Sequence, residues 1–221
     1  MSRLSIFCLP GLGLSTRIFD QLAIEFGELI MLDWIEPKGW ESIKEYAFRL
    51  SEPLLDAEGE IVLIGHSFGG VLAQEISRLR PVKQIILISS MMRHHEIPVR
   101  LKLLGQYGLH RLITRQIILL TFPFWARTHS YRTPELRQVF RASVRSLSSH
   151  YFRWALYHIS TWKDIDLLEI PVFRIHGDKD VTFEIQKIQH VDHLVKGGDH
   201  NMVYLKGKEI LEVINQLLVK V

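Results

Sequence analysis

A serine set between glycines at positions 65–70 is the part of the sequence with the clearest chemical meaning. The string Gly65-His66-Ser67-Phe68-Gly69-Gly70 follows an apolar run that ends at Ile64 and precedes a run with helical periodicity, 71–79. A strained strand-to-helix turn exposes the serine Oγ, and glycines near it leave room for the backbone. We therefore predict that Ser67 is a catalytic nucleophile; a glycine turn with a purely structural role is the alternative.

A nucleophilic serine needs a base, and the base needs a carboxylate to orient it. Asp178 and Asp180 follow one candidate strand near the C-terminus, and His200 follows the next. The carboxyl ends of parallel strands converge on one crevice, so these groups can meet Ser67 despite their distance along the chain. We favour His200 as the base over four other histidines, which we interpret as part of the turn or as packed or solvated: His66, His176, His190 and His193.

Short apolar runs alternate with helical stretches, in the order βαβαβαβ, insertion, βαβα. This order predicts an α/β fold with a mostly parallel sheet of about six strands flanked by helices. The candidate strands are Leu4–Leu9, Leu29–Asp33, Ile61–Ile64, Gln84–Ser89, Val172–His176 and a weaker one, His190–Val195. The candidate helices are Ile18–Phe26, Ser42–Leu55, Phe68–Leu79, Thr182–Gln189 and Lys208–Lys220.

The insertion, residues 91–163, has no clear strand and is rich in aromatic side chains. It holds twelve basic and two acidic residues, against eight and twelve in 1–90 and seven and ten in 164–221. We expect a helical cap at 91–163, inserted after the fourth strand of a core domain formed by 1–90 and 164–221.

With Ser67, an aspartate and His200 in this order, the chain resembles the α/β-hydrolases. It is most similar in style to small capped carboxylesterases, the group that contains pimeloyl-carrier-protein methyl ester esterases and SHCHC synthases. The resemblance covers the whole length, but two N-terminal strands of many members are missing. In the family pattern the acid lies three residues after the glycine that ends its strand, which favours Asp180 over Asp178.

Two backbone N–H groups are candidates for binding the oxyanion of a tetrahedral intermediate. Phe68 follows the serine at a helix N-terminus, where the N–H groups are free to stabilise negative charge. The resemblance implies that the second donor is the Leu12 N–H, in the loop Pro10-Gly11-Leu12-Gly13-Leu14. A glycine loop that merely turns the chain is the alternative for this segment.

Together these residues predict a serine hydrolase that cleaves a carboxylic ester or thioester through an acyl-enzyme. One alternative is a cofactor-free lyase on the same three residues, as the resemblance to SHCHC synthases allows. Another is a catalytically silent protein that uses the pocket as a receptor.

Arg137, Arg141 and Arg145 recur every four residues and form one stripe on a helix. The stripe suggests an anionic partner: an acyl carrier protein, coenzyme A, an acidic substrate or a membrane surface. A solvated arginine face, or pairing with the acidic core domain, is the alternative.

Several other classes of function find no support in the sequence. The glycine loop does not complete G-x-G-x-x-G, because Thr16 takes the third glycine position, so we expect no nucleotide cofactor. The adjacent His94-His95-Glu96 do not suit one metal ion, and no nucleic-acid-binding pattern accompanies the arginines. The longest apolar stretch, about 117–126, is too short to span a membrane, and Cys8 is the only cysteine. Without an export signal, we expect a cytoplasmic protein.

Overall fold

Six strands form the centre of the molecule in the computed structural model, which describes residues 3–24, 27–163 and 168–219. The strands are β1 (Leu4–Leu9), β2 (Glu28–Met31), β3 (Glu60–His66), β4 (Gln84–Ile88), β5 (Val172–Gly177) and β6 (His193–Val195). They lie in the order β2-β1-β3-β4-β5-β6, and every neighbouring pair is parallel. The predicted sheet of about six mostly parallel strands is confirmed.

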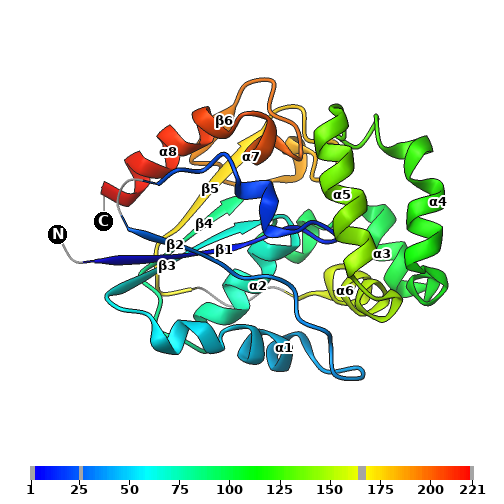
Figure 1. Cartoon of the computed structure of the whole chain (residues 1–221), viewed down its shortest axis with the longest axis horizontal. Coiled ribbons are helices and arrows are strands. Elements are labelled where there is room, and N and C mark those ends of the chain that lie inside the picture. Colours follow the sequence, from blue (N-terminus) through cyan, green and yellow to red (C-terminus); the bar gives the residue numbers. More distant parts are fainter. Residues whose placement is uncertain (1–2, 25–26, 164–167, 220–221) are drawn as a thin grey trace.

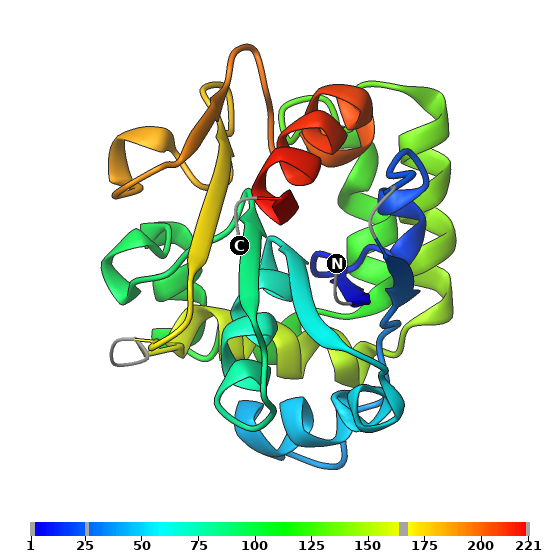
Figure 2. The same ribbon diagram turned by 90° about the vertical axis from the view of Figure 1, so that its left-hand side faces the viewer.

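The central strands are apolar because both faces of the sheet are covered. All five residues of β4 are buried. The helix α8 (Gly207–Val219) lies on one side of the sheet, and α1 (Ile43–Leu50) and α2 (Phe68–Ser77) lie on the other (Figure 1, Figure 2). The register pairs His66 with Ile88 and Gly177 with Val195, so the loops that follow these strands open at the same edge.

Two predicted helices near the N-terminus differ from the structure. The helix expected over Ser42–Leu55 starts with a capping box at Ser42 and ends at Leu50; a 3₁₀ turn, Glu52–Asp56, follows. Pro53 has no N–H to continue the helical bonds, which explains the break. The helix expected over Ile18–Phe26 was wrong: the structure has a 3₁₀ turn at Thr16–Phe19, and residues 25–26 lie outside the described residues.

The segment between β5 and β6 also departs from prediction. Instead of a helix over Thr182–Gln189 there is one 3₁₀ turn, Ile185–Lys187. The Phe183 carbonyl oxygen and the Gln189 N–H, which a helix over this range would bond internally, instead bond to His176 and Glu96. The strand expected from His190 begins only at His193, because His190 has a φ of 52° that no strand residue adopts.

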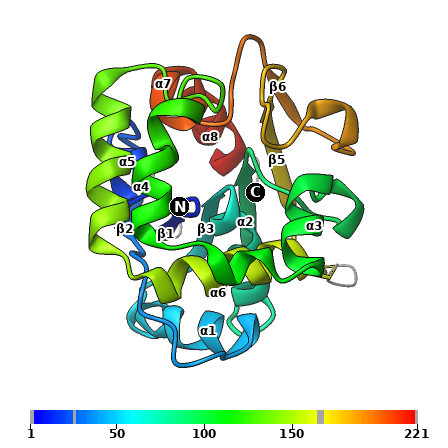
Figure 3. The same ribbon diagram turned by 90° about the vertical axis from the view of Figure 1, so that its right-hand side faces the viewer.

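Helices fill the segment between β4 and β5, which we call the inserted segment (residues 91–163). It contains α3 (Val99–Gln106), α4 (Arg115–Trp125), α5 (Pro134–Ser146), α6 (Ser149–Thr161) and two 3₁₀ turns, His94–Glu96 and Leu109–Leu112. These helices lie beyond the carboxyl end of the sheet (Figure 1), and Figure 3 views them from outside. Across the described residues, no helix is long and apolar enough to cross a bilayer.

The inserted segment is held to the rest of the molecule through α6. The Trp154 ring packs 4.2 Å from the Tyr46 ring on α1, measured between centroids. The Trp154 Nε1–H also donates to the Glu41 carbonyl oxygen at 2.8 Å. Both aromatic rings are fully buried, so this contact fixes α6 against α1. The helices α3 and α4 in turn pack against α6.

Candidate active site

Ser67 stands at the turn between β3 and α2 with a strained backbone, φ 53° and ψ −120°. A Cβ at position 65 would lie 2.4 Å from the Gly70 Cα, and one at position 69 would lie 2.2 Å from the Leu9 carbonyl oxygen. Both distances are far inside van der Waals contact, so only glycine fits. The sequence 65–70 therefore produces a turn that presents the Ser67 side chain above the sheet.

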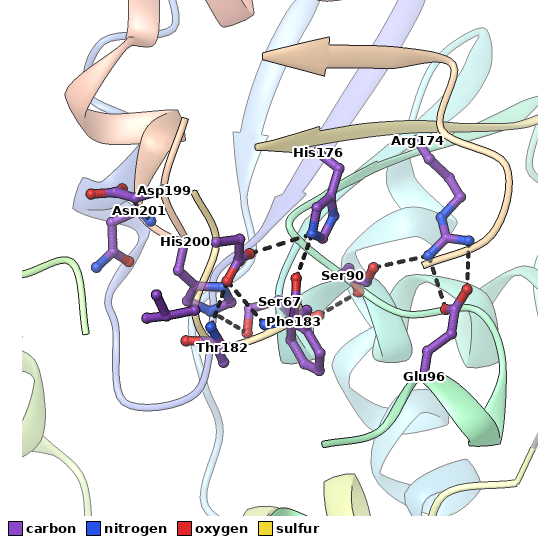
Figure 4. Close-up of polar contacts among 12 residues, drawn as sticks. Ser67, Ser90, Glu96, Arg174, His176, Thr182, Phe183, Asp199, His200 and Asn201 are labelled. Carbon is purple, nitrogen blue, oxygen red and sulfur yellow. Dashed lines mark hydrogen bonds and ion pairs between the residues drawn. The ribbon is translucent and has the colours of Figure 1, made fainter. Parts of the chain in front are cut away.

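His200 and Asp180 come to this turn from two other loops. The His200 Nε2 lies 3.0 Å from the Ser67 Oγ, and its Nδ1 lies 2.9 Å from the Asp180 Oδ2. Figure 4 shows the His200 side chain beside Ser67. In this arrangement the serine hydroxyl can donate to Nε2 while the Nδ1–H donates to the carboxylate, which is the geometry a serine nucleophile requires.

The two candidate acids, Asp180 and Asp178, have different contacts in the structure. Asp180 is buried, and its second oxygen accepts the N–H groups of Thr182 and Phe183 at 2.8 and 2.9 Å. Burial acts to raise the pKa of Asp180, but His200, His176 and the backbone N–H donors outweigh it, so the net pKa lies below the ordinary carboxyl value. Asp178 instead accepts the Gly197 N–H at 2.6 Å. Of these two aspartates, only Asp180 contacts His200.

A second buried histidine, His176, supports the Asp180 loop. Its Nε2 lies 2.8 Å from the Phe183 carbonyl oxygen and 3.6 Å from the Asp180 Oδ2. Burial lowers the pKa of His176 more than the neighbouring carboxylate raises it. The neutral ring therefore donates to the Phe183 carbonyl and fixes the loop that carries Asp180.

Buried polar groups also hold the backbone of the serine turn through hydrogen bonds. The Ser90 Oγ–H donates to the Ser67 carbonyl oxygen at 2.7 Å, and the Ser90 carbonyl accepts from Arg174 at 3.2 Å. Arg174 in turn makes two 2.9 Å hydrogen bonds to Glu96 (Figure 4). A single sequence offered no signal for this chain of contacts, because its members are 23 to 84 residues apart.

The two predicted oxyanion donors lie near Ser67. Phe68 is the first residue of α2, where a backbone N–H has no acceptor within the helix. Leu12 lines the same pocket as Ser67 and His200. The loop that carries Leu12 is held by the Trp34 Nε1–H, which donates to the Leu14 carbonyl oxygen at 2.7 Å.

An apolar pocket of about 480 Å³ opens above Ser67, between the sheet and the inserted helices. Its walls come from α3, α4, α5 and α6 together with the Asp180 loop. Thirteen of the nineteen described residues that line it are aliphatic or aromatic, and Arg100 is the one lysine or arginine among the nineteen. Typical lining residues are Leu104, Ile118, Trp125, Phe140, Phe152 and Ile159. Such a pocket suits an uncharged hydrocarbon group.

The predicted arginine stripe on α5 lies away from the pocket lining, and two of its members make internal contacts. The Arg137 Nε–H donates to the Tyr131 carbonyl oxygen at 2.7 Å. The Arg141 guanidinium lies 5.2 Å from the centroid of the Phe122 ring. Arg145 is exposed.

In the His94-His95-Glu96 segment, His94 and Glu96 contact other protein groups. Glu96 is buried against Arg174, and the His94 Nδ1 lies 2.7 Å from the Trp162 carbonyl oxygen. Within the part of the chain that the structure describes, no group of three or more histidine, cysteine, aspartate or glutamate side chains is arranged to hold a metal ion.

Comparisons with solved structures find the same architecture. MenH from Staphylococcus aureus has 17% identity and a TM-score of 0.72, over 99% of this chain and 94% of that one. A thermophilic esterase from Thermogutta terrifontis has 17% identity and a TM-score of 0.70, over 100% and 92% of the two chains. YbtT, a type II thioesterase of the yersiniabactin NRPS/PKS pathway, has 19% identity and a TM-score of 0.67, over 97% and 92%.

A search of curated protein sequences finds no match. A family model described as the alpha/beta hydrolase family, in contrast, matches residues 6–213, nearly the whole chain. The parallel sheet, the glycine-flanked serine turn and this match agree, and the chain belongs to the alpha/beta hydrolase family.

Proposed function

We propose that this protein is a serine hydrolase that cleaves a carboxylic ester or thioester through an acyl-enzyme on Ser67. The observation that supports it best is the position of the His200 ring, hydrogen-bonded to Ser67 on one side and to Asp180 on the other. The esterase and thioesterase structural neighbours support hydrolysis as the reaction class.

In the proposed reaction the Ser67 Oγ attacks the substrate carbonyl carbon and its proton passes to the His200 Nε2. Asp180 holds the imidazole in the required tautomer and stabilises its charged form. The N–H groups of Leu12 and Phe68 bind the oxyanion, and loss of one such donor costs about 3 to 4 kcal/mol in a comparable hydrolase. His200 then protonates the leaving alcohol or thiol. Water, activated by the same histidine, releases the acid and regenerates the serine.

The acyl group of the substrate is, in this proposal, an uncharged hydrocarbon chain held by the apolar pocket. The inserted helices would act as a cap that keeps water from this chain. For the leaving group, a carrier-protein or coenzyme A thioester at the arginine stripe is the finer prediction, and Arg145 is its exposed member. Turnover of a carrier thioester should then fall steeply with salt, while that of a neutral ester should not.

Labelling with a fluorophosphonate tests the nucleophile directly. Intact mass and peptide mapping should find one adduct, on Ser67, and none in Ser67→Ala. Ser146→Ala is the matched control, because Ser146 lies on α5 with its Oγ bonded within the helix, and it should label like the wild type. A folded wild type that stays unlabelled, or that labels elsewhere, would overturn the proposal.

The two alternatives from the sequence make different predictions. A silent receptor would bind ligand without turnover on any ester. A cofactor-free lyase would turn over its substrate with no acyl-enzyme detectable by rapid quench and mass spectrometry. An acyl adduct on Ser67 that accumulates with a slow ester and then decays would exclude both.

A further inference from the structure

The outer surface of α3, α4 and the turn between them is apolar although it faces solvent. Phe124 is 85% exposed and Leu120 is 75% exposed, both on α4. We call six of the exposed large apolar side chains of these elements the apolar rim: Leu103, Tyr107, Leu112, Ile117, Leu120 and Phe124. Leu120 and Phe124 stand one turn apart on α4, and large apolar side chains that lie side by side in water favour a partner that covers them.

The stretch of chain that carries the apolar rim has charged residues of one sign only. From residue 97 to residue 134 the sequence has six basic residues and no acidic one. Arg111 and Arg127 are exposed and flank α4, one before its N-terminus and one after its C-terminus. A partner for this surface must therefore accept apolar side chains in the middle and positive charge at the ends.

The apolar rim is continuous with the pocket above Ser67. Ile117 and Thr121 are exposed and also line the pocket. On the same helix, Ile118 and Trp125 turn into the pocket while Leu120 and Phe124 remain outside. One helix thus forms both a wall of the acyl pocket and the centre of the apolar rim, on the side of the inserted helices away from the sheet (Figure 1, Figure 3).

We propose that the apolar rim docks this protein on an anionic phospholipid surface, with Leu120 and Phe124 inserted among the lipid headgroups. Amphipathic helices with leucine and aromatic side chains on one face and arginines nearby bind such surfaces by this combination. The pocket then meets the membrane at its α4 edge, which favours an acyl ester that resides in the bilayer over a carrier-protein or coenzyme A thioester as the substrate. This last step rests on the proposed hydrolase function; the docking itself does not.

A lipid surface fits this arrangement better than a protein partner. The 11 residues of α4 span about 16 Å, and the flanking arginines stand at its two ends rather than beside its apolar centre. A bilayer offers anionic headgroups in every direction around an inserted apolar helix. An acidic carrier protein would offer its charges at one compact patch, and a second copy of this chain would bring like charges together.

Co-sedimentation with vesicles tests the docking without turnover, on the Ser67→Ala protein. Binding should be strong to phosphatidylcholine vesicles that contain phosphatidylglycerol and weak to phosphatidylcholine alone. The double variant Leu120→Ser/Phe124→Ser should bind at least about tenfold more weakly, because it removes the inserted side chains. The matched control is Leu55→Ser, 65% exposed on the 3₁₀ turn Glu52–Asp56, which should bind like the parent.

Two further variants test how much the flanking arginines contribute to vesicle binding. Arg111→Gln and Arg127→Gln should each weaken binding to the anionic vesicles about fivefold. Lys208→Gln, an exposed cation on α8, should change nothing.

Three results would overturn the docking proposal. The first is absence of binding to anionic vesicles, and the second is equal binding by the parent and the Leu120→Ser/Phe124→Ser variant. The third is a parent that is dimeric by light scattering and becomes monomeric in that variant, since a second copy then covers the rim. Fluorophosphonate labelling is scored separately, so loss of docking and loss of the hydrolase function are distinguishable.

Discussion

The imidazole Nε2 of His66 lies 2.8 Å from the backbone carbonyl oxygen of His200. His66 is completely buried, and burial together with the nearby His200 lowers its pKa to about 3, so the ring is neutral and Nε2–H donates. The residue before the predicted nucleophile thus binds the backbone of the residue predicted to be the base. This bond joins the serine turn to the histidine loop independently of the bond between Ser67 and His200.

Removing this donor should reduce catalysis more than substrate binding. His66→Phe leaves the buried His200 carbonyl without its partner, which costs about 1 to 3 kcal/mol and frees the histidine loop to shift. We expect kcat to fall at least about tenfold with KM nearly unchanged, because the pocket is untouched. His66→Gln can place an N–H near the same oxygen and should restore most of the activity. Equal activity of the two variants would contradict this role.

The buried His66 should also make stability depend on pH on the acid side. Below about pH 6.5 the unfolded chain takes up a proton on this imidazole, while the folded protein does so only near pH 3. The free energy of unfolding should therefore fall as the pH falls from 6.5 toward 3, by up to about 1.4 kcal/mol per pH unit from this group. Urea unfolding of His66→Gln at several pH values should give a shallower decline. Parallel declines for both proteins would show that His66 does not contribute.

The two aspartates after β5 should differ sharply in their effect on turnover. Asp180→Asn leaves a similar shape but no longer holds the histidine tautomer, and kcat should fall about 10⁴-fold, as in a comparable triad. Asp178→Asn is the matched control, since Asp178 only accepts the Gly197 N–H, and its effect should stay within about tenfold. Steady-state kinetics on one p-nitrophenyl ester measures both. A larger loss in Asp178→Asn would assign the acid to the other position.

The buried ion pair of Glu96 and Arg174 should be coupled in its effect on stability. Either Glu96→Leu or Arg174→Met leaves a charge without its partner in the interior, which costs about 3 to 5 kcal/mol. The double variant leaves no buried charge, and its loss should be clearly smaller than the sum of the two single losses. Urea unfolding of the four proteins gives the coupling energy. Additive losses would mean that the pair does not act as a unit.

The pocket should set the length of the acyl chain. Leu104 lines the pocket from α3, so Leu104→Trp should shift the preferred p-nitrophenyl ester to a shorter chain. Leu103 is the adjacent residue on the same helix but is exposed outside the lining, and Leu103→Trp should keep the wild-type preference. An unchanged chain-length profile in Leu104→Trp would move the acyl site elsewhere.

Sequence reasoning succeeded where the determinants are local. The parallel sheet follows from apolar runs separated by helical ones, and the serine turn follows from Gly65 and Gly69, whose replacement would clash within a few residues or with the adjacent strand. It failed for Thr182–Gln189, because the Phe183 carbonyl there bonds to His176 and the Gln189 N–H bonds to Glu96 instead of within a helix. Helical propensity does not register such a competing partner.

The sequence by itself determined the family, the order of the elements and a short list of polar residues able to meet at the carboxyl edge of the sheet. Only the tertiary structure decided that Asp180 contacts His200 while Asp178 turns to Gly197, and that His66 binds the His200 backbone. It also decided that Arg137 and Arg141 make contacts within the inserted segment. The physical reason is that each choice depends on hydrogen-bond geometry between loops far apart in the chain, and directional bonds of about 3 Å are set by strand register and packing.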